Sequence, residues 1–242
     1  MSQQLTPIED GIWVCNGGIV SFWGFAYPTR SVVVRLADGL WVWSPVDLSA
    51  ELRDEVEALG PVAHLVSPNK IHHLFLAAWK EAFPAARLWG LRSCIARHPE
   101  LAFEAPLGDS PPSEWRGVID QAWFTGSAFL DEVMFLHAPS RTAIVADLIQ
   151  AFSEEFLRQH WAWWQRPLAR LDGLSAERPG APREWRASFV HLDAARAARV
   201  KVLSWSCERV IIAHGDGCRT GGEAYLRRAL AWMGPESEGA RV

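Results

Sequence analysis

The sequence predicts an α/β (α+β) protein in which two β-sheets pack face to face with helices outside them. Strand-like segments come first and in succession, later strands alternate with helices, and a strand–loop–helix unit ends the chain. The chain has 242 residues, of which 49% are hydrophobic, enough for a sizeable core. Neither a linker nor an internal repeat divides it, so we expect a single domain over residues 1–242.

The first third of the chain carries strong strand and helix signals. Two apolar runs flank Ala37-Asp38-Gly39, which predicts a β-hairpin. Ser49 is placed to cap a helix that Gly60 ends. The expected elements are strands over 11–18, 31–36, 40–43 and 62–66, a helix over 50–60, a helix over 74–83, a strand over 86–90 and a short helix over 93–101.

A loop rich in Pro, Gly and Ser, residues 105–117, precedes the second half. The segment 131–149 reads as a hairpin that turns at residues 138–141. The other expected elements are a strand over 119–126, a helical stretch over 151–174, an exposed excursion over 175–185, a helix over 193–205, a strand over 209–213 and a terminal helix over 223–233.

Composition and charge narrow the class of protein. The net charge of −4 gives no general electrostatic case for binding nucleic acid or an anionic membrane. No uncharged apolar run is long enough to cross a bilayer, and "MSQQLTPIEDG" lacks the regions of a signal peptide. The four cysteines form no CxxC pair, so neither a zinc ribbon nor a disulfide framework is suggested. We expect a soluble, cytoplasmic protein.

Fourteen tryptophans are the compositional peculiarity of the chain. Most lie in apolar runs, as Trp41, Trp43 and Trp205 do, and are expected to fill the core. Trp161, Trp163 and Trp164 instead crowd together within an expected Trp-rich helical insertion at about residues 151–200. A helix packed against the main body is favoured there and a homodimer contact comes second. A lid or a surface that touches lipid headgroups are further alternatives.

Metal-capable side chains follow three apolar strands. His72 and His73 come after one expected strand, Asp147 ends "RTAIVAD", and His214 follows "RVIIA". Each has a structural alternative, since His72 and His73 can cap a helix, Asp147 can be an N-cap and His214 can belong to a turn. Strand ends can nevertheless converge in space, and in α/β proteins that edge is where ligands bind. Three imidazoles and a carboxylate suit one divalent transition metal, zinc or iron.

The order of the hairpin, "HLVSPNKIHHL", "TAIVADLI" and "VIIAHGDG" resembles the metallo-β-lactamase superfamily over nearly the whole chain. It is most similar to an uncharacterised, DUF4336-like domain-of-unknown-function family at the edge of that superfamily. The resemblance implies an αββα sandwich with a one- or two-metal site on one edge, often in a hydrolase. It also implies that His72, His73, Asp147 and His214 hold the second metal of the superfamily.

The chain departs from the superfamily motif H-x-H-x-D-H. Pro68 and Lys70 replace the first two His, His72 replaces the Asp, and His73 matches the last His. The resemblance therefore implies that the first metal site is dismantled. The ammonium of Lys70 would repel a second cation and can hold an anionic group of the substrate. With one Asp among the ligands, a divalent ion would keep roughly one net positive charge.

The leading hypothesis is a hydrolase-like protein with a single metal, which acts on an ester, lactone or thioester of a small molecule. Lys70 is expected to position the substrate, and Asp216 to orient His214 or add a carboxylate, unless it is an exposed turn residue. The alternative is a non-catalytic protein of the same fold that binds a small molecule or a partner. Iron-based redox chemistry is a third possibility.

Overall fold

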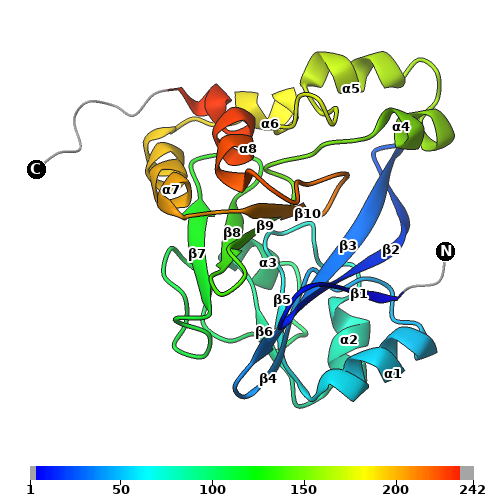
Figure 1. The fold of residues 1–242 in the computed structure, drawn as a ribbon, viewed down its shortest axis with the longest axis vertical. Helices are drawn as coiled ribbons and strands as arrows, with labels where there is room; N and C mark the ends of the chain where they lie inside the picture. Colours follow the sequence, from blue (N-terminus) through cyan, green and yellow to red (C-terminus); the bar gives the residue numbers. More distant parts are fainter. Residues whose placement is uncertain (1–3, 235–242) are drawn as a thin grey trace, which may run out of the picture. The chain divides into compact units, whose positions relative to one another are not determined.

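A computed structural model of the chain describes residues 4–234, and they fall into two units that each carry a β-sheet (Figure 1). The N-terminal unit is Met1–Val118 and the C-terminal unit is Ile119–Val242. The single-domain organisation expected from the sequence stays a prediction. None of the helices within residues 4–234 is long and apolar enough to cross a membrane.

The N-terminal unit contains a six-stranded sheet in the order β1-β2-β3-β4-β5-β6. The first four strands pair antiparallel, and β4, β5 and β6 pair parallel because helices connect them. The elements are β1 (Leu5–Glu9), β2 (Ile12–Phe22), β3 (Phe25–Leu36), β4 (Gly39–Trp43), α1 (Ala50–Leu59), β5 (Val62–Val66), α2 (Leu76–Ala82), β6 (Arg87–Trp89) and α3 (Arg92–Ile95).

Several local predictions are confirmed here. Leu36 pairs with Gly39 across the predicted β3–β4 hairpin. Helix α1 begins where expected, because the Ser49 side chain accepts a hydrogen bond from the backbone N–H of Leu52 at 3.1 Å. Gly60 ends it with φ +143°.

The β2–β3 ribbon is longer than predicted, and β1 was not predicted. We expected the first strand to end at Gly17-Gly18, but β2 continues through an irregularity between Asn16 and Ile19. A Cβ on Gly17 would lie 2.7 Å from that of Val46, so this glycine permits close packing rather than ending the strand.

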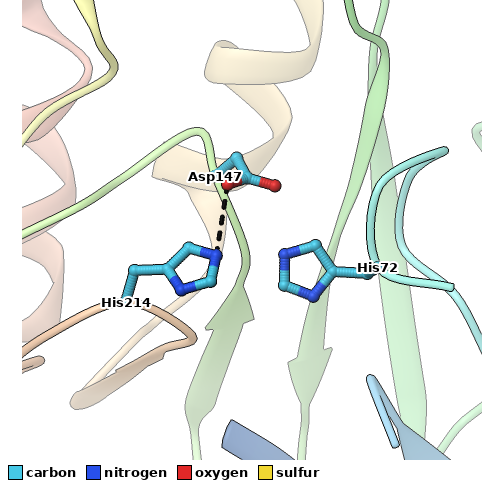
Figure 2. A group of neighbouring side chains, drawn as sticks. All are labelled: His72, Asp147 and His214. Carbon is cyan, nitrogen blue, oxygen red and sulfur yellow. Dashed lines mark ion pairs between the residues drawn. The ribbon is translucent and has the colours of Figure 1, made fainter. Parts of the chain in front are cut away.

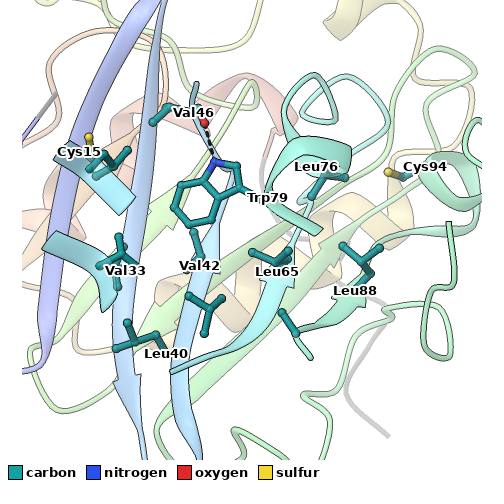
Figure 3. Close-up of a cluster of buried hydrophobic side chains, with 14 residues drawn as sticks. Cys15, Val33, Leu40, Val42, Val46, Leu65, Leu76, Trp79, Leu88 and Cys94 are labelled. Atoms are coloured by element: carbon teal, nitrogen blue, oxygen red, sulfur yellow. Dashed lines mark hydrogen bonds between the residues drawn. The ribbon is translucent and has the colours of Figure 1, made fainter. Parts of the chain in front are cut away.

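The core of the N-terminal unit lies between the sheet and its helices (Figure 3). Trp79 of α2 is 1% exposed, and its indole Nε1 donates to the carbonyl of Val46 at 2.6 Å. The fully buried ring is thus also satisfied in its polar atom. The other buried members of this cluster are Cys15, Val33, Leu40, Val42, Val46, Leu52, Val56, Val62, Leu65, Leu76, Ala86, Leu88 and Cys94.

The C-terminal unit contains a four-stranded sheet in the order β10-β9-β8-β7. Strands β7, β8 and β9 are antiparallel, and β10 lies parallel to β9. The predicted hairpin is confirmed, with His137 opposite Thr142. The elements are β7 (Ile119–Phe124), β8 (Glu132–His137), β9 (Thr142–Val145), α4 (Glu154–His160), α5 (Arg166–Asp172), α6 (Arg183–Ala187), α7 (Asp193–Ser204), β10 (Arg209–Ile212), α8 (Gly222–Ala229) and the 3-10 helix η1 (Ala231–Met233).

The exposed excursion predicted over residues 175–185 is wrong in its second half. Residues 179–182 are buried, and Trp185 of α6 is 2% exposed. The indole Nε1 of Trp185 donates to the carbonyl of Leu130 at 2.9 Å. Polar and proline-rich composition suggested a surface loop, but this tryptophan anchors the segment to the unit.

The prediction for the tryptophans is confirmed for the core ones, whereas Trp161, Trp163 and Trp164 lie in the turn between α4 and α5 and not on the helix that was favoured for them. Trp41, Trp43 and Trp205 are buried, as expected of core residues. In the segment around α4 and α5, Trp161 is 4% exposed and packs against Phe152, with ring centroids 5.4 Å apart. Trp163 and Trp164 are 79% and 54% exposed. Their role as a homodimer contact stays a prediction.

Candidate metal centre

Asp147 and His214 lie side by side because of the parallel register of β9 and β10. Val145 pairs with Ile212, and each of the two residues stands two positions beyond its strand. The backbone N–H of Ala213 continues the ladder by donating to the carbonyl of Val145 at 3.0 Å. His214 Nε2 consequently lies 3.2 Å from Asp147 Oδ1, as the dashed line in Figure 2 shows. Both side chains are buried, at 6% and 4% exposure.

The loops that carry these two residues are held to each other by their backbones. The N–H of Ala151 donates to the carbonyl of His214 at 3.1 Å, and the N–H of Asp216 donates to the carbonyl of Ala151 at 2.8 Å. Gly215 makes this approach possible, because it has φ +113° and a Cβ there would lie 2.0 Å from the Ala151 oxygen. The Gln150 side chain adds a contact of 3.3 Å from its Nε2 to Asp147 Oδ1.

Asp216, expected to assist His214, has an exposed side chain. Both backbone groups of Asp216 form hydrogen bonds: its N–H donates to the carbonyl of Ala151, and its carbonyl accepts from the Tyr225 hydroxyl at 3.3 Å. Burial and nearby negative charge raise the pKa of that hydroxyl above its ordinary value, so it stays a neutral donor. This geometry agrees with the turn alternative for Asp216, and its proposed catalytic role stays a prediction.

In the N-terminal unit, His72 is oriented by Ser44. Ser44 directly follows β4 and is 6% exposed, and its Oγ lies 2.7 Å from His72 Nδ1. Its backbone takes φ +48°, and its N–H donates to the carbonyl of Val66 at the end of β5. A hydrogen bond at Nδ1 fixes the imidazole and makes Nε2 the nitrogen suited to bind a ligand.

The loop between β5 and α2 is folded by its own polar side chains. Asn69, which is fully buried, accepts hydrogen bonds at Oδ1 from the backbone N–H groups of Ile71 at 2.9 Å and His72 at 3.1 Å. Ser67 Oγ donates to the carbonyl oxygens of Asn69 and His72. Such side-chain-to-backbone bonds build an Asx-type turn, which sets the direction of His72.

His73 has a different partner from His72. Its Nδ1 lies 2.8 Å from His98 Nε2, and His98 Nδ1 lies 2.8 Å from Glu100 Oε1. Burial, followed by the nearby His98 and Arg97, lowers the pKa of His73 below its ordinary value. Lys70, on the same loop, is half-buried, and its carbonyl accepts from Arg97 at 3.2 Å.

Two further histidines, His64 and His137, are structural. His64 is fully buried, with Nε2 3.1 Å from Asp38 Oδ2 and Nδ1 accepting from the Trp89 indole at 3.1 Å. Burial lowers the pKa of His64. His137 is buried at the far end of β8, with Nδ1 2.7 Å from Ser140 Oγ.

Four residues that support these side chains were not identified from the sequence. Asn69, which follows Ser67-Pro68 after β5, is a recognisable turn residue, and Glu132 is a carboxylate at the start of a mostly apolar strand. Ser44 and His98 carry no such signal, because only the tertiary structure brings them to their partners. Asn69 and Ser44 orient His72, His98 contacts His73, and Glu132 binds the backbone of the Asp147 loop.

Comparisons with known proteins identify the fold. No protein-family model matches the sequence, and no curated protein does. Solved structures match over nearly the whole chain. The metallo-β-lactamase DIM-1 has a TM-score of 0.64 at 12% identity, with 96% of this chain and 97% of that chain covered. A metallo-β-lactamase from Pontibacter korlensis has a TM-score of 0.62 at 12% identity, with 96% and 99% covered.

The mono-zinc form of the metallo-β-lactamase FIM-1 from Pseudomonas aeruginosa has a TM-score of 0.56 at 11% identity, with 93% of this chain and 95% of that chain covered. At these identities the likeness shows the fold. The metallo-β-lactamase-like α/β fold predicted from the sequence is therefore confirmed. The more specific link to the DUF4336-like family stays a prediction.

Proposed function

We propose that the chain is a metal-dependent hydrolase-like protein whose single divalent metal is held by His72, Asp147 and His214. The observation that carries the proposal is a buried pair of ligand-type side chains just beyond β9 and β10 of the C-terminal unit, with His214 Nε2 3.2 Å from Asp147 Oδ1 (Figure 2). His72 of the N-terminal unit, which Ser44 engages at Nδ1, is the third ligand that we assign. The fold shared with metallo-β-lactamases supports it independently.

The donor set suits zinc. Ligand bonds of about 2.0–2.1 Å in a tetrahedral site place neighbouring donor atoms about 3.3 Å apart. The 3.2 Å between His214 Nε2 and Asp147 Oδ1 fits that separation. Imidazole nitrogen and carboxylate oxygen are ligands that zinc accepts, and iron accepts them as well. The part of His73, the fourth ligand predicted from the sequence, stays a prediction.

The surrounding residues prepare these side chains for binding. Ser44 engages His72 Nδ1 and thereby presents Nε2, the role that second-sphere partners of metal-bound histidines have. The replacement of two superfamily histidines by Pro68 and Lys70 supports occupancy by one ion rather than two. FIM-1 has been crystallised in a mono-zinc form, so a single zinc is compatible with this fold.

The reaction proposed is hydrolysis of an ester, lactone or thioester of a small molecule. A bound divalent metal lowers the pKa of a coordinated water and so supplies hydroxide at neutral pH. Asp147 and His214, which are both buried, would hold the ion in surroundings of low dielectric constant, where it stabilises developing negative charge more strongly than in water. Lys70 would attract a carboxylate or phosphate group of the substrate.

Elemental analysis combined with substitution tests the proposal. Protein purified without chelator is expected to contain about one zinc or iron per chain, and a coloured preparation would indicate iron. His214→Ala and Asp147→Ala should lower the metal content of the purified protein well below one ion per chain, while weak binding of added metal can persist, and should abolish any hydrolysis of an ester, lactone or thioester panel. His160→Ala, at an exposed position on α4, is the matched control and should retain both. Metal-free wild-type protein, or unchanged metal in His214→Ala, contradicts the proposal.

A second candidate is a non-catalytic protein of the same fold. The ion pair between Asp147 and His214 favours it, because these two buried groups satisfy each other without an ion. This candidate predicts no stoichiometric metal and a loss of folding stability when either partner is removed. The cytoplasmic location, the small-molecule substrate and the homodimer stay predictions under both candidates.

A further inference from the structure

Glu132 is a charged residue in the interior of the C-terminal unit. It begins β8, pairs with Phe124 of β7 and is 0% exposed, like its apolar neighbours on the strand. A carboxylate is almost never fully buried unless hydrogen bonds or charges compensate it. Its place in the core therefore needs a physical reason.

The reason lies in the loop that carries Asp147. Glu132 Oε2 accepts the backbone N–H of Asp147 at 2.8 Å, and Oε1 accepts that of Ala146 at 3.0 Å. The N–H of Leu148 lies 3.4 Å from Oε1 and 3.3 Å from Oε2. Three consecutive N–H groups thus converge on one carboxylate, which is the arrangement of a backbone anion-binding nest.

We propose that Glu132 is a positioning residue of the metal centre, which holds the backbone of residues 146–148 so that the Asp147 carboxylate faces His214. The inference rests on the proposed function, because it gives Glu132 a role in metal affinity. Hydrogen bonds on both sides of the Asp147 Cα leave the loop little freedom to rotate. The remaining side-chain freedom is limited by the contact with Gln150.

The charge of Glu132 also matters to the ion. Asp147 contributes one negative charge, and neutral imidazoles contribute none, which would leave a divalent ion with one uncompensated charge. Glu132 is a second buried carboxylate close to Asp147, because it accepts the hydrogen bond of the Asp147 backbone N–H. Two carboxylates and two neutral imidazoles balance a divalent cation. On this proposal the site with its ion would be neutral, and the one net positive charge expected from the sequence stays the alternative prediction.

This role requires a side chain in which both terminal atoms accept hydrogen bonds, as the two carboxylate oxygens of Glu132 do. Glutamine has nearly the same shape, but its NH2 group would face an N–H donor and could not accept its hydrogen bond. The substitution Glu132→Gln therefore removes the charge and part of the nest while it keeps the volume of the side chain.

The test is a double-mutant cycle read by zinc affinity. The full chain is titrated with Zn²⁺ against a chromophoric chelator, as wild type, Glu132→Gln, Asp147→Ala and the double variant. Glu132→Gln is expected to weaken zinc binding by about 10–100-fold, the range for second-sphere partners. In the Asp147→Ala background, Glu132→Gln should change zinc affinity by less than about 3-fold, because Glu132 acts on the ion through the Asp147 carboxylate, which that variant lacks. Glu184→Gln, the same change at an exposed position of α6, should leave affinity unaltered.

Each outcome decides between named alternatives. A Glu132→Gln variant that binds zinc like wild type, or that weakens binding equally in both backgrounds, overturns the inference, and the second result assigns Glu132 a merely structural role. If far-UV circular dichroism shows that Glu132→Gln does not fold, Glu132→Asp replaces it in the same cycle, with the same two criteria. Absence of zinc binding in the wild type instead contradicts the proposed function, and the inference falls with it.

Discussion

The substitution Gly215→Ala tests whether the His214 loop depends on its close approach to Ala151. A Cβ at Gly215 would lie 2.0 Å from the Ala151 oxygen, where real contacts of less than 3.0 Å essentially never occur. The loop must therefore move, and the hydrogen bonds from Ala151 to His214 and from Asp216 to Ala151 lengthen or break.

The expected loss of stability follows from two contributions. Placing alanine at φ +113° costs about 1–2 kcal/mol. Loss of two backbone hydrogen bonds costs about 1–3 kcal/mol more. The free energy of unfolding should therefore fall by about 2–5 kcal/mol. Gly221→Ala is the matched control, because Gly221 also has a positive φ, +70°, but no atom within 4 Å of its Cβ position. It should lose only about 1–2 kcal/mol.

Urea unfolding followed by tryptophan fluorescence measures both variants against the wild type. Zinc affinity provides the functional comparison, because the displaced loop carries His214. We expect at least a tenfold loss of affinity in Gly215→Ala and none in Gly221→Ala. Equal unfolding free energies for the two variants would refute the argument, since only Gly215 has the steric conflict.

Three further predictions concern other parts of the chain. Ser44→Ala should weaken zinc binding by about 10–100-fold, because the contact at His72 Nδ1 is lost. Ser49→Ala should cost about 1 kcal/mol of stability through the α1 cap and leave zinc affinity intact. Weaker zinc binding in Ser49→Ala but not in Ser44→Ala would contradict the proposed role of Ser44. Trp79→Phe should lower the unfolding free energy by about 1–3 kcal/mol because the buried Val46 carbonyl loses its donor, and Trp164→Phe, at a 54% exposed position, by no more than about 0.5 kcal/mol. In metal-free protein, the free energy of unfolding should fall as the pH drops below 6.5, the ordinary histidine pKa. Burial lowers the pKa of His64 and His137 in the folded protein, so the unfolded chain binds more protons in this range. Urea midpoints that are equal at about pH 8 and about pH 5.5 would show that these histidines do not control the pH dependence of stability.

Local patterns predicted much of the fold. The Ser49 cap, the Gly60 stop and the two hairpins are each decided by residues within one segment, where sequence carries the information. Strand β1 escaped prediction because Leu5–Glu9 has a Pro and little apolar alternation. The buried α6 segment escaped because Trp185 finds its partner, the Leu130 carbonyl, far away in the chain.

In the candidate metal centre, too, the sequence predicted local features and not the contacts between residues that are far apart in the chain. "TAIVAD" and "RVIIAH" each place a ligand-type residue just beyond an apolar run, and this was visible in the sequence. The parallel register of Val145 with Ile212, which brings Asp147 to His214, was not, because strand pairing is a tertiary property. Glu132 is visible in the sequence as a carboxylate in a mostly apolar strand, but the backbone N–H groups that it binds, 14 and 15 residues further along the chain, are not.

Anomalous diffraction at the zinc edge, from a crystal grown with Zn²⁺, tests the central claim most directly. The account predicts a single strong peak per chain, bonded to His72, Asp147 and His214 at about 2.0–2.2 Å. A map without a peak at these three residues, or one in which the metal binds elsewhere while Asp147 and His214 keep their direct contact, would contradict it.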